Sequence, residues 1–189
     1  MVIRSKENLD KYLFLYRSFI FYFVNFSTTL KDKDSKLIID ALNIKSRYRR
    51  IYFTIDKVCD QIDNYYKNKN LCVFSNCRCI CHRSLNLDYI NGCCHKCIYQ
   101  SNNGCLSKNF ACKMFNCSYV KDRYKTINYS DLKLLNVLTP LQRMVLKRDY
   151  FSSIDEVSKD LYFGPIYSIF RISIRTYKTT FCNRKFTKK

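Results

Sequence analysis

The chain of 189 residues has no tryptophan, three glycines and two prolines, and its thirty-four lysines and arginines far outnumber fifteen acidic residues. So few glycines leave no room for a flexible linker. The glycine-rich P-loop and the G-x-G-x-x-G motif of nucleotide-binding enzymes are absent. Both histidines lie within one cysteine cluster, so the rest of the chain cannot supply a Ser–His–Asp triad. We therefore expect neither an enzyme of these classes nor a small-molecule substrate.

The chain also lacks a long uninterrupted apolar segment. Its most apolar run, from Tyr12 to Val24, is broken by Arg17, whereas a membrane span needs about 18 nearly uncharged residues. The same run has no small-residue cleavage site of the kind that ends a signal peptide. We expect an intracellular protein in the cytoplasm or nucleus of a host cell, not a membrane protein. In a reducing compartment, clustered cysteines are more often metal ligands than disulfides.

Cysteine is the residue type in clear excess. Of twelve cysteines, ten lie between Cys72 and Cys117, together with both histidines. Zinc takes four such ligands, often in pairs two to four residues apart, and Cys94 with Cys97 has this spacing. The surrounding stretch is rich in asparagine and serine and poor in aliphatic residues, so it needs a cross-link, such as a bound metal ion, to become ordered. We predict about two zinc ions, with these candidate ligands: Cys77, Cys79, Cys81, His82, Cys94, His95, Cys97, Cys105, Cys112 and Cys117.

Other interpretations of the cluster stay open. Disulfides and an iron–sulfur cluster are two of them. A third is a RING-like or treble-clef module that presents a rigid surface to a ubiquitin-conjugating enzyme, although the paired C-x2-C start and the C-x-H step are absent. This ubiquitin-ligase reading is the enzymatic alternative. We interpret Cys59 and Cys182, outside the cluster, as ordinary small hydrophobes.

Hydropathy patterns predict a small α-rich (α+β) protein with a zinc-stapled irregular central module. Residues 1–71 form a helical, basic and aromatic N-terminal region, residues 72–120 the Cys/His-rich module, and residues 121–189 a basic C-terminal region. Three helices are expected in the first region, with Ser35 capping the second and a strand as the alternative for the start of the third: 6–24, 35–44 and 49–66.

The C-terminal region is predicted to return to regular structure. Helices are expected over residues 130–138, 139–151 and 152–163. Thr139 before Pro140 is a helix-start signal, and Ser153 with Glu156 has the spacing of a capping box. From Phe170 onward, apolar and basic residues alternate, which favours a terminal strand over a helix.

Positive charge is the second strong signal. The net charge is +19, and basic residues exceed acidic ones in all three regions, a balance that attracts polyanions. The stretch "NIKSRYRRIYF" mixes cations that neutralise phosphates with rings that stack on unpaired bases. A merely solvated basic face is the alternative. We predict nucleic-acid binding, with RNA favoured over DNA, by Arg47, Tyr48, Arg49, Arg50 and Tyr52. The aromatic N-terminal helix offers a surface to a protein partner.

The cysteine motifs "SNCRCIC…INGCCHKC…FACKMFNC" follow one another over about residues 75–120. In this order they resemble the small cysteine-rich zinc-finger nucleic-acid-binding proteins of carlaviruses and related plant RNA viruses. The resemblance implies zinc held by Cys77 or Cys79 with Cys94, Cys97, Cys112 and Cys117. It also implies a viral regulatory protein that binds RNA, regulates genes or suppresses host RNA silencing.

A second resemblance lies in "LTPLQRMVL…SSIDEVSKDL". This stretch is similar to the first two helices of a helix-turn-helix of the sigma-region-four type. The resemblance implies a transcription regulator whose recognition helix falls within residues 165–175 and offers Arg171 and Arg175 to the major groove.

Overall fold

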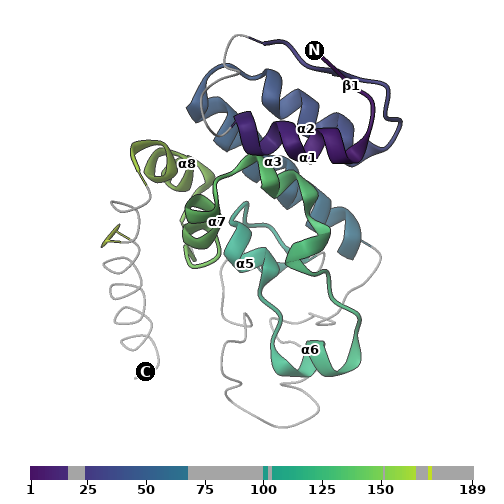
Figure 1. The fold of residues 1–189 in the computed structure, drawn as a ribbon. Coiled ribbons are helices and arrows are strands. Elements are labelled where there is room, and N and C mark those ends of the chain that lie inside the picture. The colour runs from purple at the N-terminus through teal and green to yellow at the C-terminus, as the bar shows by residue number, and fades with distance from the viewer. Residues whose placement is uncertain (17–23, 68–99, 102–103, 151, 165–169, 172–189) are drawn as a thin grey trace, which may run out of the picture.

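The protein is described by a computed structural model over residues 1–16, 24–67, 100–101, 104–150, 152–164 and 170–171. This part of the chain is rich in helix, as predicted, and its few strands are short (Figure 1). The longest helix, α3 (Arg47–Tyr66), packs against α2 (Lys33–Asn43), α5 (Phe110–Met114) and α8 (Ile154–Phe163). None of the helices in these ranges is long and apolar enough to cross a membrane.

The N-terminal end of the fold contains a two-residue parallel pairing of β1 (Val2–Ile3) with β2 (Ser27–Thr28). Between them lies α1 (Lys6–Tyr16), which buries Leu9 and Leu13. The predicted helix extends further, but residues 17–23 lie outside the described ranges. Phe26 ties this end to α2, because its backbone N–H donates to Asn43 Oδ1 at 2.7 Å while Asn43 Nδ2 donates to the Phe26 carbonyl at 2.8 Å.

The start of α2 differs from the prediction. Asp32, not Ser35, is the N-cap residue, and its Oδ1 accepts a hydrogen bond from the Ser35 backbone at 3.0 Å. Both residue types are good caps. Ser35 is buried within the first turn, so the chain uses the earlier residue and the helix begins two positions before the predicted start at residue 35.

The central helix α3 is helical from its first residue, which excludes the alternative of a strand. Ser46 Oγ caps it by accepting from the Arg49 backbone N–H at 3.4 Å. Ile51, Ile55, Val58 and Ile62 are buried at spacings of three and four residues, which place them along one side of a helix. This side joins a single hydrophobic core that receives residues from Ile3 through Leu161.

Part of the predicted irregular module is regular. A short antiparallel pair, β3 (Gln100–Ser101) with β4 (Gly104–Cys105), precedes α5, and α6 (Ser118–Arg123) follows it. Asn109 caps α5 through Oδ1, which accepts from the Cys112 N–H at 2.9 Å. Its Nδ2 donates to the carbonyls of Asp149 at 2.7 Å and Ser152 at 3.0 Å. With Phe110 in the core, α5 is held by the helical scaffold.

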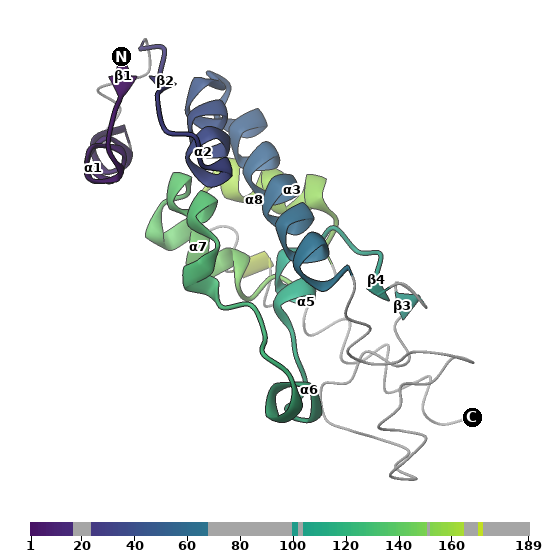
Figure 2. The same cartoon turned by 90° about the vertical axis from the view of Figure 1, so that its right-hand side faces the viewer.

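The C-terminal helices begin where their caps predicted. Thr139 and Gln142 form a capping box at α7 (Pro140–Leu146), and Ser153 and Glu156 form one at α8. Residues 130–138 are a pair of 3₁₀ helices instead of the predicted α-helix: η1 (Tyr129–Asp131) and η2 (Lys133–Val137). The helix predicted over 139–151 ends at Leu146. In Figure 2, α7 lies to the left and α3 to the right, with α8 behind them.

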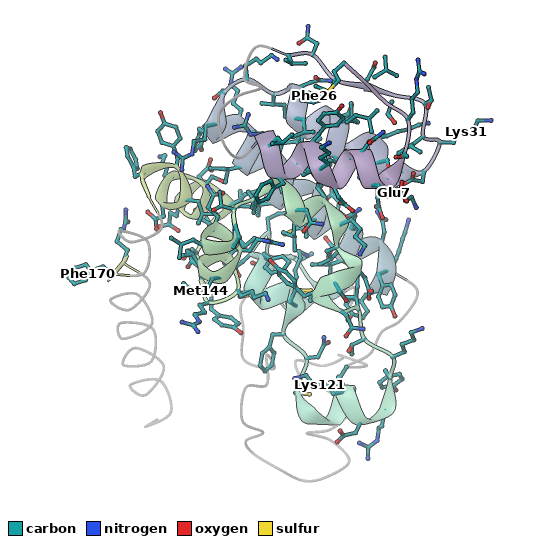
Figure 3. The ribbon with its side chains drawn as sticks, in the orientation of Figure 1. Glu7, Phe26, Lys31, Lys121, Met144 and Phe170 are labelled. Atoms are coloured by element: carbon teal, nitrogen blue, oxygen red, sulfur yellow. The ribbon has the colours of Figure 1, made fainter. Side chains whose placement is uncertain are left out.

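The segment predicted as a terminal strand is helical where it is described. Phe170 and Arg171 have helical backbone, and the remaining residues from 172 onward lie outside the described ranges. Arg171 Nη1 lies 3.1 Å from Oδ1 of Asp160, a buried residue of α8. This ion pair ties the segment to α8, while Phe170 points away from the fold and is 69% exposed (Figure 3).

Candidate nucleic-acid interface

The first turn of α3 carries three arginines and no acidic residue. The positive end of the helix macrodipole lies at this turn, so each cation placed here costs about 0.3–1 kcal/mol at a surface position. Arg47 is half-buried and Arg49 is exposed. The arginines at the start of α3 therefore destabilise the helix, and an anion bound nearby offsets this effect.

Aromatic rings from two helices meet beside these arginines. The rings of Tyr48 and Tyr52 have centroids 6.5 Å apart, as expected for neighbours at i and i+4. Tyr162 of α8 meets Tyr48 edge-on, with centroids 6.3 Å apart and planes at 89°. The Arg47 guanidinium carbon lies 5.9 Å from the centre of the Tyr162 ring, within the range of a cation–π contact. We call Arg47, Tyr48, Arg49, Tyr52 and Tyr162 the α3 surface.

One hydrogen bond fixes the centre of the α3 surface. The Tyr48 hydroxyl donates to Asp155 Oδ1 at 3.1 Å. Partial burial, and next the hydrogen bond to this carboxylate, raise the pKa of Tyr48 above its usual value, so the phenol keeps its proton. Tyr48, Arg49, Tyr52 and Asp155 line a shallow hollow of about 270 Å³. The surface thus combines two arginines, three rings and one carboxylate that the Tyr48 hydroxyl already engages.

Arg50 lies apart from the other predicted nucleic-acid-binding residues. It is only 8% exposed, and its Nη1 donates to the Ile44 carbonyl at 2.9 Å. This bond holds the guanidinium against the carbonyl end of α2, where it is buried, unlike Arg47 and Arg49. Arg171 is engaged by Asp160, and Arg175 lies outside the described residues. The structure therefore groups Arg47, Tyr48, Arg49 and Tyr52, and it separates Arg50 and Arg171 from them.

The contribution of α8 could not be predicted from the sequence. Asp155 and Tyr162 are more than one hundred residues from Tyr48 in the chain, and only the packing of α8 on α3 brings them together. Phe163, 72% exposed, stacks edge-on against Tyr162 with centroids 5.5 Å apart. A pair of exposed aromatic residues at the end of an otherwise amphipathic helix was the available signal.

Two of the predicted zinc ligands have described side chains. Cys112 is a half-buried residue of α5, and Cys117 is the buried N-cap residue of α6. Among the residues that the structure describes, no three histidine, cysteine or acidic side chains gather as a metal site. Cys105 belongs to β4, with no side chain described. The other predicted ligands lie outside the described ranges: Cys77, Cys79, Cys81, His82, Cys94, His95 and Cys97.

Cys59 is a core residue, as its position outside the cluster predicted. It is fully buried in α3, where its thiol donates to the Lys108 carbonyl at 3.6 Å. Burial raises the pKa of Cys59 to about 12, more than Lys113 and Lys108 nearby lower it. A thiol so strongly held in its neutral form is a poor metal ligand or nucleophile. Cys182, interpreted in the same way, lies outside the described residues.

Ion pairs fasten the segment that carries Cys112 to the second half of α3. Lys108 Nζ lies 3.3 Å from Asp56 Oδ1 and also contacts Asp60. One helical turn further along α3, Asp63 pairs with Lys113 of α5. The acidic half of α3 thus faces residues 108–113, while its basic half forms the α3 surface.

We compared the chain with protein-family models, with curated proteins and with solved structures, and none of them matches it.

Proposed function

We propose that this protein is a zinc-binding, basic regulatory protein that binds nucleic acid, RNA in preference to DNA, and is of viral type. The α3 surface is the proposed contact for the nucleic acid. Arg47 and Arg49 neutralise phosphates, and the rings of Tyr52 and Tyr162 offer platforms for unpaired bases. Single-stranded RNA is the favoured ligand because its bases are free to stack.

The observation that carries this proposal is the first turn of α3. Its arginines stand at the positive end of the helix dipole, where no described carboxylate forms an ion pair with Arg47 or Arg49. Asp155, the acidic residue of the hollow, accepts its hydrogen bond from Tyr48. A phosphate bound at this turn offsets the unfavourable placement of the two cations at the positive end of the dipole.

Zinc is proposed as a structural ion of the cysteine-rich stretch. The donor set, thiolates and imidazoles, is the one that zinc prefers. Cys112 would contribute a thiolate from α5, which the core supports, and Cys117 one from the start of α6. The zinc contributes folding free energy to this stretch, and α5 attaches the stretch to the hydrophobic core.

The test is a salt titration of binding to fluorescent single-stranded RNA, duplex RNA and duplex DNA. The double variant Arg47→Gln and Arg49→Gln removes up to two phosphate contacts. Its slope of log affinity against log salt should flatten by about 1.4 for a single strand and about 1.8 for a duplex. The control is Lys11→Gln with Lys36→Gln, which removes two exposed cations of α1 and α2.

The control variant should keep the wild-type slope to within a few tenths, since contacts at the α3 surface are intact. Equal flattening by both variants would mean that net charge, not the α3 surface, determines binding. Failure of the wild-type protein to bind any of the three nucleic acids at about 100 mM salt would refute the proposed function.

A further inference from the structure

A second hollow lies on α7 and shares no lining residue with the hollow at the α3 surface. It has a volume of about 390 Å³ and is lined by Tyr129, Pro140, Arg143, Met144, Lys147 and Arg148, which we call the α7 pocket. Its volume is at the small end of the range for ligand pockets, about 300–1,000 Å³. Met144, one of its residues, lies on the outer side of α7 (Figure 3). The pocket is therefore open to a ligand from solvent.

Three of the lining residues are cations, and no acidic residue lines the pocket. Arg143 and Lys147 are four residues apart and share a side of α7. Within the described ranges, none of the three cations forms an ion pair with a carboxylate. Three like charges at one hollow repel one another, so a bound anion stabilises the arrangement.

Two of the cations are positioned by their neighbours. Lys147 Nζ sits 3.6 Å from the centre of the Tyr129 ring, a cation–π contact that holds the ammonium over the ring. Arg143 Nη1 donates to Asn136 Oδ1 at 2.9 Å. These contacts fix both charged groups and leave further N–H donors on each for a ligand. The pocket is thus partly organised before any ligand arrives, which lowers the entropy cost of binding.

Tyr129 adds an unused polar group. Its hydroxyl is buried and has no hydrogen-bond partner among the described residues, a state that costs about 1–3 kcal/mol. Burial raises the pKa of Tyr129 to about 12, although Arg143 acts in the opposite direction. The phenol therefore stays protonated at neutral pH and can donate. Phe110 supports the ring from the core side, edge-on at 5.8 Å between centroids.

We propose that the α7 pocket binds the phosphomonoester group of a nucleotide. A phosphomonoester carries a charge of about −1.5 to −2 at pH 7, which matches three converging cations better than the single charge of an internal phosphodiester. The pocket is larger than a phosphate alone requires, and Tyr129, Pro140 and Met144 give it apolar walls for a sugar or base. The ligand is either a free mononucleotide or the phosphorylated end of an RNA strand. This inference goes beyond the proposed function, since a mononucleotide does not need the α3 surface.

The experiment measures binding of adenosine 5′-monophosphate, adenosine, the dinucleoside phosphodiester ApA and O-phosphoserine to the full-length protein by calorimetry. Adenosine 5′-monophosphate should bind at least about tenfold more tightly than adenosine or ApA, because charged hydrogen bonds each contribute about a factor of ten or more. Its affinity should fall about tenfold from pH 7 to pH 5 as the phosphate loses its second charge. A 5′-phosphorylated RNA should likewise bind more tightly than its 5′-hydroxyl counterpart if the strand end is the natural ligand, and equally if the free mononucleotide is.

The double variant Lys147→Gln and Arg148→Gln should abolish the preference for adenosine 5′-monophosphate over adenosine. Lys11→Gln with Lys36→Gln is the charge-matched control, and the Arg47→Gln, Arg49→Gln variant is the control for the other surface. Both controls should keep the preference. Circular dichroism of each variant should match the wild type, because none of the changed side chains is buried.

Equal affinity for adenosine 5′-monophosphate and adenosine would overturn the inference, and so would unchanged binding by the Lys147, Arg148 variant. Equally tight binding of O-phosphoserine would overturn the assignment to nucleotides. RNA binding without a preference for the monophosphate would remove the inference and leave the proposed function standing. Tighter binding of adenosine 5′-monophosphate than of adenosine, without RNA binding at any salt concentration, would refute the proposed function and leave this inference standing.

Discussion

Lys113 of α5, with only 3% of its side chain exposed, forms an ion pair with Asp63 of α3. A buried ammonium is costly unless a partner compensates it. Here the compensation joins the helix that carries Cys112 to the second half of the central helix, one residue after the buried Ile62. The ion pair therefore connects α5 to a part of α3 that packs in the hydrophobic core.

Asp63→Asn should lower the free energy of unfolding by about 1–2 kcal/mol, because Lys113 loses its charged partner while Asp63 itself is half exposed. Urea unfolding measures the change as a shift in midpoint at constant slope. The matched control is Asp10→Asn, an exposed residue of α1 that forms no ion pair among the described residues. A loss of unfolding free energy equal to that of the control would show that the ion pair does not contribute to stability.

Tyr52→Leu should weaken binding of single-stranded RNA by about 1–3 kcal/mol with little change in salt slope, because stacking is not ionic. Tyr52→Phe should retain most of the affinity, since the ring remains. Phe14→Leu, on an exposed residue of α1, controls for the general loss of an aromatic ring. Fluorescence anisotropy at several salt concentrations separates the two effects. If Tyr52→Phe binds as weakly as Tyr52→Leu, the hydroxyl and not the ring is the contact.

Cys112→Ser should reduce the zinc content of the purified protein, and the predicted ligands Cys94 and Cys97 should behave in the same way when changed to serine. Cys59→Ala should keep its zinc but lower stability by about 1 kcal/mol, because it removes only a buried sulfur atom. Cys182→Ser should be nearly silent. Elemental analysis gives the metal content. Absence of zinc from the wild type, with disulfides found by non-reducing mass spectrometry, would contradict the zinc proposal.

Acid should weaken the contacts between α3 and the residues before α5. Burial raises the pKa of Asp60, but hydrogen bonds from Lys108 and Lys57 outweigh it, so the folded-state pKa lies below the usual value. The unfolded chain therefore takes up the proton first, and the stabilisation present above about pH 4 is lost as the pH falls through the folded-state pKa. Asp60→Asn should flatten the pH dependence of the unfolding free energy as the pH falls below about 4, and an unchanged pH dependence would show that Asp60 does not contribute to it.

Local signals in the sequence predicted much of the helical scaffold. The caps at Thr139 and Ser153 are formed as expected, and the buried periodicity of α3 matches its apolar pattern. At the start of α2 the N-cap residue is Asp32 and not the predicted Ser35, which is buried within the first turn. Such a choice between caps depends on tertiary packing, which local pattern does not contain.

Short elements and the candidate sites were harder to predict. Five-residue α5 exists because Asn109 binds two distant carbonyls and Phe110 enters the core, and neither contact is visible in its own stretch of sequence. The basic and aromatic residues of α3 were predicted as a group. Their partner ring, Tyr162, and the inward turn of Arg50 depend on how α8 and α2 pack against α3.

Helix α3 ends at Tyr66, just before the interval 68–99, and the chain after this interval packs against α3 again through α5. Tyr66, the last residue of α3, also receives a hydrogen bond from the backbone of Ile127 at 3.1 Å. The described residues on both sides of this interval are thus attached to one helix, and the entropic cost of closing a loop grows only slowly with its length. A change in the number of residues within 68–99 is therefore expected to cost the described helices little.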